Sequence, residues 1–261
     1  MAPAPQLDVY GELLAAAHRL ADQLGDLDQT TRSFLVAAAD IAGRRWQDKD
    51  QGIWEIRGPP RDFLHSKLLC WVALDRAVTV AVALGAKDRV EGWTASRDEI
   101  RAAILEDGWS ERAGAFTQAF DSDELDASSL LLAIVGFLPA SDPRMKATID
   151  AVAARLTDDR GLVYRYRTSD GQEGTFLLCS FWLAQALAGQ VDQAKATFER
   201  AVGYANDVGL LAEKVDPASR ELLGNFPQAF SHIGLVNAAW TIAQVERPTR
   251  NCATDSHDRG L

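Results

Sequence analysis

The chain has 261 residues, of which 47% are hydrophobic and 25% are charged, as is typical of a globular protein with one large domain or two small ones. Its formal net charge of −10 disfavours binding to a nucleic acid backbone, which requires clustered lysines and arginines. The sequence has no apolar run near the roughly 20 residues of a membrane span and no basic, then apolar leader, so we expect a cytoplasmic protein.

Apolar residues recur at helical spacing along most of the chain, with two short β segments between them. We expect helices over 7–24, about 30–46, 66–84, a fourth around the Ser96–Glu99 capping box, then 125–138, 142 to about 158, 177–188, 192–206 and 228–245. A hairpin is expected over 109–120 and a short alternating strand over 162–167. Helices 66–84, 125–138 and 177–188 are apolar on more than one side, as interior helices are.

This alternation of buried and amphipathic helices predicts an all-α fold in which an inner layer of helices is wrapped by an outer one. No change in composition marks a domain boundary, so residues 1–246 are interpreted as one domain. Residues 247–261 are polar, and we expect this tail to be disordered.

Cysteines and histidines give no sign of a disulfide framework or a metal site. Cys70, Cys179 and Cys252 are far apart, and two of them lie in apolar helical stretches. The four histidines have no HxxxH or similar ligand spacing. We therefore predict no metal and no other cofactor.

The loop over residues 48–60 holds one acidic residue, Glu55, directly after Trp54. Gly52, Pro59 and Pro60 make it a shaped loop rather than a helix end. A carboxyl group desolvated by a neighbouring indole can keep its proton near neutral pH, which suits a general acid. The plainer alternative is a solvated surface glutamate beside a packing tryptophan.

Five segments, taken together, resemble glycoside hydrolase family 15, the group of glucoamylases, glucodextranases and bacterial trehalases. In chain order they are Asp50–Gly58, Ser66–Arg76, Leu125–Ser128, Glu173–Trp182 and the loop formed by Gly209–Pro217 and Leu223–His232. Each segment alone is a weak signal. Their order and spacing fit the family from about residue 7 to residue 245.

The resemblance implies an incomplete (α/α)6 toroid and inverting hydrolysis of an α-glucoside of the glucoamylase or trehalase type. Glu55 matches the general acid of the family and Glu213 its general base, and an inverting pair needs carboxyl groups about 6.5–9.5 Å apart. Candidates for the lining of the sugar pocket are Trp54, Arg57, Lys67, Trp109 and Glu173. Asp126 is a further candidate, either directed toward the pocket or capping a helix.

The chain also departs from the family pattern. Family members carry an N-terminal β-sandwich, twelve ring helices and a Trp-x-Arg-Asp stretch whose Arg and Asp hold the sugar; none of these is complete here. Lys214 and Val215 stand where Glu and Tyr are commoner. An open ring exposes apolar helix flanks, so we expect a homo-oligomer or a second chain to cover it.

Several readings of this mixture stay open. The chain is a fragment of a longer hydrolase, a natural short protein completed by another chain, or a fold reused as a cyclase, lyase or isomerase acting on a non-sugar metabolite. A non-catalytic sugar-binding remnant is the fourth. In each reading the expected partner is a small molecule.

Overall fold

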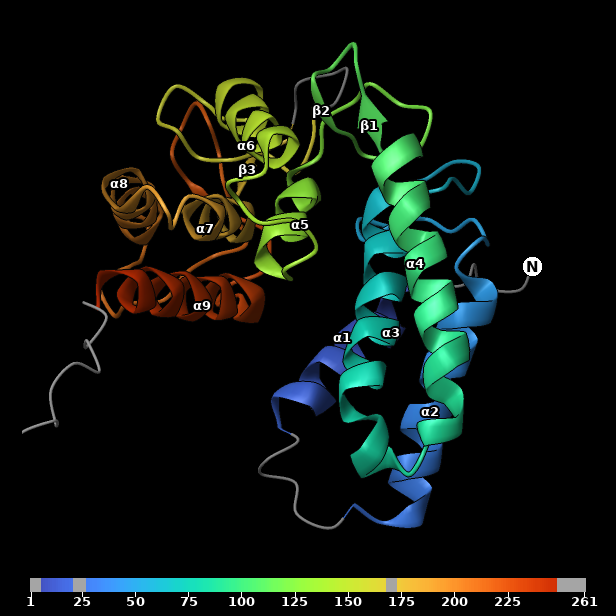
Figure 1. The fold of residues 1–261 in the computed structure, drawn as a ribbon. Coiled ribbons are helices and arrows are strands. Elements are labelled where there is room, and N and C mark those ends of the chain that lie inside the picture. Colours follow the sequence, from blue (N-terminus) through green and yellow to red (C-terminus); the bar gives the residue numbers. More distant parts are fainter. Residues whose placement is uncertain (1–5, 21–26, 168–172, 248–261) are drawn as a thin grey trace, which may run out of the picture.

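The computed structural model describes residues 6–20, 27–167 and 173–247, and most of these residues are helical (Figure 1). Within them the α-helices are α1 (Asp8–Arg19), α2 (Gln29–Arg45), α3 (Leu64–Leu84), α4 (Val90–Asp107), α5 (Leu131–Ile134), α6 (Pro143–Arg155), α7 (Leu177–Ala186), α8 (Val191–Val202) and α9 (Ala229–Glu246). Two 3-10 turns, η1 (Lys87–Arg89) and η2 (Ala127–Leu130), add to these. The predicted all-α class is confirmed.

Short strands form two small antiparallel sheets beside the helices. β1 (Trp109–Ser110) pairs with β2 (Ala115–Phe116) in the predicted hairpin. β3 (Thr175–Phe176), β4 (Lys214–Val215) and β5 (Leu222–Leu223) form the other sheet, with β4 in the middle. Phe176 is paired with Lys214, which brings segments far apart in the sequence to one place.

The first half of the chain packs around α3. This helix contacts α1, α2 and α4, and 14 of its 21 residues are buried, as expected for a helix that is apolar on more than one side. α1 can approach α3 closely because Gly11 has no side chain. A Cβ atom at Gly11 would lie 2.3 Å from the carbonyl oxygen of Leu69.

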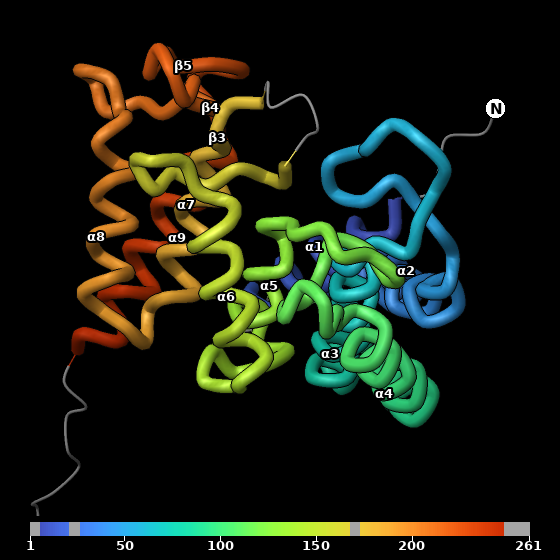
Figure 2. Tube along the Cα trace, turned by 90° about the horizontal axis from the view of Figure 1, so that it is seen from above, coloured from blue at the N-terminus to red at the C-terminus, as the bar shows by residue number. Residues whose placement is uncertain are grey.

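The second half packs around α7, and Figure 2 shows it as a separate group of helices beside the first. Nine of the ten residues of α7 are buried, and its neighbours include α8 and α9. η2 lies between the two halves and contacts both α3 and α7.

Capping residues explain where two of the helices begin. Asp28 precedes α2, and its carboxylate accepts the backbone N–H of Thr31 at 2.8 Å. Asp142 does the same for Arg144 at 2.9 Å, and Pro143 occupies the first position of α6 as predicted.

The structure differs from the prediction in two segments. The helix expected over 125–138 is only the turn η2 followed by the single-turn α5, because Asp126 has an extended backbone and Gly136, at a φ of 80°, ends the helix. The strand expected over 162–167 is not a strand. Val163 and Tyr166 form isolated bridges, to Thr157 and Asp126 respectively.

Smaller differences concern helix limits. α4 runs through Ser96 and Glu99 without a break, so these residues are interior and do not cap a restart. α1 is described as far as Arg19, and the rest of the predicted helix to residue 24 falls largely outside the described residues. The tail predicted to be disordered also lies outside them, apart from Arg247. Among the described helices, none is both long enough and apolar enough to cross a membrane.

Candidate active site

The loop that carries Glu55 is fastened to the core by Lys67, which is only 1% exposed. The ammonium group of Lys67 donates to the carbonyl oxygens of Trp46 at 2.7 Å and Asp48 at 2.6 Å. It also lies 3.0 Å from a carboxylate oxygen of Asp62. A lysine has three N–H donors, and these partners account for all of them. Lys67, predicted to line a sugar pocket, therefore holds both ends of the loop from below.

Within the loop, the backbone turns sharply at Asp50 and Gly52. The buried carboxylate of Asp50 accepts the N–H of Gly52 at 3.1 Å, and the Asp50 backbone pairs with Arg61 in an antiparallel bridge. Gly52 has a φ of 65°, and a Cβ atom there would lie 2.8 Å from the ring of Phe63. Glycine is required at this turn for both reasons.

Glu55 is exposed at the tip of this turn, with a left-handed φ of 48°. Its side chain accepts a hydrogen bond from the amide of Gln6 at 3.2 Å. A non-glycine residue in this backbone region costs roughly 1–3 kcal/mol, and such strain is concentrated at functional sites. The desolvation by Trp54 that the sequence suggested is not what the structure shows, because Glu55 is solvated. Arg57, on the same loop, is also exposed.

Trp54 points away from solvent into an aromatic cluster. Its ring centroid lies 5.6 Å from that of Phe176 and 6.1 Å from that of Trp182. Its indole N–H donates to the carboxylate of Asp126 at 2.8 Å. These contacts fix the tryptophan next to Glu55 in one orientation, so the first site residue and the protein interior are directly connected.

Asp126 is buried and serves both of the roles that were left open. One carboxylate oxygen accepts the backbone N–H of Ser128 at 2.7 Å, which caps η2. The other accepts from Trp54 and, at 3.0 Å, from the amide of Gln118. Burial raises the pKa of Asp126, while these hydrogen bonds oppose the rise because they stabilise the ionised form.

A charged chain of contacts leads from Trp54 to the neighbour of Glu213. The guanidinium of Arg165 lies 5.1 Å from the centroid of the Trp54 ring and is paired with Glu173. The same oxygen of Glu173 is 3.2 Å from the ammonium group of Lys214. All three charged side chains are largely buried, so this network is more rigid than an exposed ion pair. Glu173, predicted to bind sugar, here links two loops.

Glu213 precedes β4 and is held by its neighbours in the sheet. Its carboxylate oxygen Oε2 accepts both the backbone N–H of Asn225, at 3.0 Å, and the side-chain amide of Asn225, at 2.9 Å. Gly224 has a φ of 76°, and a Cβ atom there would lie 2.7 Å from the same oxygen. Any larger residue at position 224 would displace the carboxylate.

The structure thus joins Trp54, Asp126 and Glu173 in one network that ends beside Glu213. Trp109 lies elsewhere: its indole N–H donates to Glu111 at 2.9 Å, and its ring packs on Phe116 at 5.4 Å. Sequence reasoning did not single out three side chains that complete the network. They are Arg165, Lys214 and Asn225. Only the alternation of Arg and Tyr over 164–167 hinted at the first.

Comparison with known proteins decides the family. A sequence model of the glycosyl hydrolases family 15 matches residues 2–198 and 188–240. The chain belongs to glycosyl hydrolase family 15. The trehalase of Mycobacterium tuberculosis is 42% identical over 249 residues, which are 92% of this chain and 36% of that protein. The trehalase of Thermoplasma volcanium is 34% identical over 239 residues, 90% of this chain and 38% of the relative.

Solved structures agree on the fold of this family 15 chain. A glycosidase variant in complex with glucose superposes with a TM-score of 0.79 at 22% identity, over 92% of this chain and 67% of the glycosidase. A bacterial glucoamylase complexed with acarbose gives 0.78 at 14% identity, over 93% of this chain and 41% of the glucoamylase. The predicted incomplete (α/α)6 toroid is confirmed. The chain spans little more than a third of the length of the two trehalases.

Proposed function

We propose that this family 15 chain contributes the acid and base of an inverting α-glucosidase, and that its substrate is trehalose. Glu55 is the general acid and Glu213 the general base. The observation that carries the proposal is the contact network from Trp54 through Arg165 and Glu173 to Lys214, because it couples the two loops on which these glutamates lie. The similarity to proteins named trehalase supports the choice of substrate.

In the proposed reaction the two carboxyl groups act on opposite faces of one glucosyl unit. The Glu55 carboxyl group gives its proton to the glycosidic oxygen as the bond from that oxygen to C1 breaks. The Glu213 carboxylate takes a proton from a water molecule whose oxygen attacks C1 from the other side. Trehalose then yields two glucose molecules, one of them with inverted configuration, and solvent restores both protonation states.

The local contacts of Glu213 suit a base. Oε2 receives both hydrogen bonds from Asn225, so the carboxylate cannot rotate freely, and we assign the proton of the attacking water to Oε1. A base that is already oriented does not have to lose that freedom during the reaction.

The exposure of Glu55 suits an acid that meets its substrate at the mouth of the site. A sugar that covers the loop would remove water from the carboxyl group and so favour its protonated form. Trp54 beneath it offers the apolar surface that a pyranose ring packs against, while its N–H stays bonded to Asp126.

The first test is release of glucose from trehalose, maltose and a maltooligosaccharide by the purified chain. We expect Glu55→Gln and Glu213→Gln each to lower kcat by about 10²- to 10⁴-fold, the usual range for loss of a general acid or base. Glu221→Gln is the matched control, since Glu221 is exposed on the same loop as Glu213. Proton NMR of the first glucose formed distinguishes inversion from retention.

Two results would contradict the proposal. Retained configuration in the first product would exclude the inverting assignment. Full activity in either glutamate variant would exclude that residue as acid or base. A folded chain that releases no glucose from any of the three sugars would shift the search to the cyclase, lyase or isomerase reading and to a sugar-binding remnant. The cytoplasmic location stays a prediction.

A further inference from the structure

One face of α9 is apolar and exposed. Phe230, Ile233, Val236 and Trp240 follow one another at helical spacing, and their side chains are 60%, 53%, 61% and 63% exposed. The segment from Ala229 to Val245 contains no Asp, Glu, Lys or Arg. Single exposed apolar residues are ordinary, but a contiguous row of four large ones on a helix marks an interaction surface. These four residues are called the α9 row below.

The opposite face of α9 is packed in the normal way. Gly234 lies against α7, where a Cβ atom would be 2.9 Å from a methyl group of Leu178. Ser231, Ala238 and Ile242 are buried on the same side. α9 is therefore apolar on both sides but covered on one. A helix that is apolar all round is normally interior, so the α9 row lacks the neighbour that its composition specifies.

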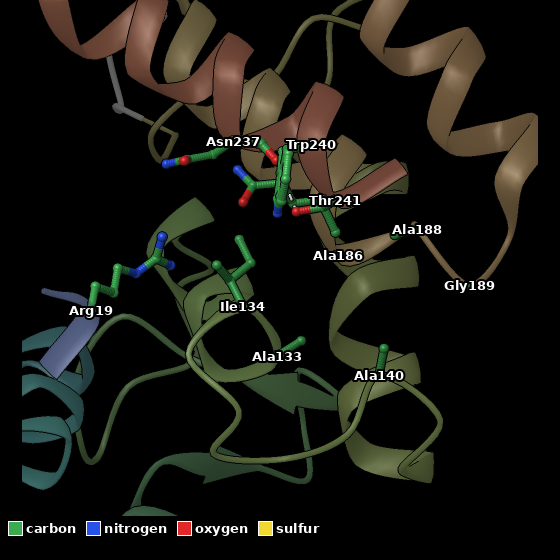
Figure 3. Close-up of a pocket in the computed structure, with 11 residues that line it drawn as sticks. Arg19, Ala133, Ile134, Ala140, Ala186, Ala188, Gly189, Asn237, Trp240 and Thr241 are labelled. Atoms are coloured by element: carbon green, nitrogen blue, oxygen red, sulfur yellow. Dashed lines mark hydrogen bonds between the residues drawn. The ribbon is translucent and has the colours of Figure 1, made fainter. Parts of the chain in front are cut away.

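A cavity of about 200 Å³ opens beside the α9 row (Figure 3). Trp240 and Asn237 border it from α9, Ile134 from α5, and Arg19 from the end of α1. A water molecule takes roughly 30 Å³ of liquid, so the cavity is far larger than one water needs and is large enough for a bulky side chain. The α9 row and the cavity share Trp240 and form one continuous surface between α9 and α1.

The relatives indicate what covers this surface. The glycosidase that superposes on 92% of this chain has a further third of its length without a counterpart here, and the trehalases have more than half. A second copy of this chain is a poorer occupant, because the net charge of −10 makes two copies repel each other.

We propose that the α9 row and its cavity bind an apolar helical segment from the part of a family 15 polypeptide that lies outside these 261 residues. One large apolar side chain of that segment fills the cavity beside Trp240, and an acidic group meets Arg19 at the rim. The proposal concerns binding alone and does not depend on the reaction proposed above.

The test is co-expression of the tagged 261-residue chain with the part of the Mycobacterium tuberculosis trehalase that lies outside the matched stretch. We expect the two to co-purify at a 1:1 ratio. The double variant Ile233→Asp/Trp240→Asp should lower the bound fraction at least tenfold. Val82→Asp is the control, because Val82 is 70% exposed on α3, in the other half, and this variant should bind as the parent does.

A chemical probe reports on the same surface without relying on retention. In a Cys252→Ser background, Val236→Cys adds a thiol to the α9 row, whereas Cys70 and Cys179 are buried. Alkylation of Cys at position 236 should be at least tenfold slower in the co-expressed complex than in the chain alone.

Three results would overturn the proposal. One is that the parent chain fails to bind the trehalase part although both are soluble. Another is equal binding by the double variant and the parent. The third is a dimer of the chain alone that the double variant converts to monomer, since the occupant would then be a second copy.

Discussion

The two halves of this family 15 chain each contain a long apolar helix, and the surroundings of the two helices differ. α3 has α1, α2 and α4 around it and buries 14 of its 21 residues. α9 packs on α7 and α8 and buries only four of its 18 residues. Composition alone predicts burial for both. The difference teaches that an exposed apolar face can describe a neighbour supplied by another part of a protein.

The strongest way to break this comparison is to place a charge on each helix. Leu68 in α3 is fully buried, so Leu68→Asp would bury an unpaired carboxyl group and cost about 4–5 kcal/mol, enough to unfold most of the chain. Ile233→Asp in the α9 row should change the free energy of unfolding by no more than about 0.5 kcal/mol. Thermal unfolding followed by circular dichroism measures both. An equal loss in the two variants would mean that the α9 row is already covered.

Glycines at the two helix contacts sharpen the comparison at lower energy. Gly11→Ala would force α1 away from the backbone of Leu69 and should cost about 3 kcal/mol, at the upper end of the usual range for overpacking. Gly234→Ala meets only the movable side chains of Leu178 and Phe181 and should cost about 1 kcal/mol. Urea denaturation gives both values.

Gly92→Ala is the control for these two variants. Gly92 lies in α4, and a Cβ atom there meets nothing within 4 Å. Alanine should stabilise the helix by about 0.5–1 kcal/mol. If Gly234→Ala proved more costly than Gly11→Ala, the second half would be the more tightly packed one, and the comparison would fail.

Acid should weaken the first half through His65, which is buried in α3. Burial lowers the pKa of His65 from 6.5 to about 3, and its nearest acidic group is Asp8 of α1, 3.7 Å away. Between those two pH values the unfolded chain binds a proton that the folded chain does not, so stability falls as the pH falls below 6.5. The loss from pH 7 to pH 5.5 is about 1 kcal/mol.

The variant His65→Leu isolates this contribution. It should remove the loss in that pH range, while Asp8, Glu12 and Asp126 titrate in both proteins. Burial raises the pKa of each of these three acids, so they act in the opposite direction. Parallel stability curves for the variant and the parent between pH 5.5 and 7 would show that His65 does not contribute. Chemical denaturation at several pH values is the measurement.

Much of the fold follows from local signals in the sequence. α2, α3, α7 and α9 lie close to where apolar periodicity predicts them, and Asp142 with Pro143 marks the start of α6. The segment 125–138 failed because its uniform apolarity conceals the cap at Asp126 and the turn at Gly136. A continuous apolar run contains no information about where a helix ends.

The site was less accessible to sequence reasoning because its contacts are long-range. Trp54 and Arg165 are more than 100 residues apart, and no spacing rule connects them. Family resemblance selected Glu173 but not its link to Lys214, which depends on the pairing of β3 with β4. The predicted roles of Glu55 and Glu213 remain predictions. Trp109 shows how a motif position can fall outside the network that its neighbours form.

The anchoring of the Glu55 loop by Lys67 has a consequence for protein engineering. Two of the three acceptors are backbone carbonyl groups, at Trp46 and Asp48, and these exist whatever side chains the positions carry. Only Asp62 contributes a side chain to the anchor. The stretch between residues 49 and 61 can therefore be exchanged as a cassette, with its attachment to the core preserved by Lys67, Asp62 and the backbone alone.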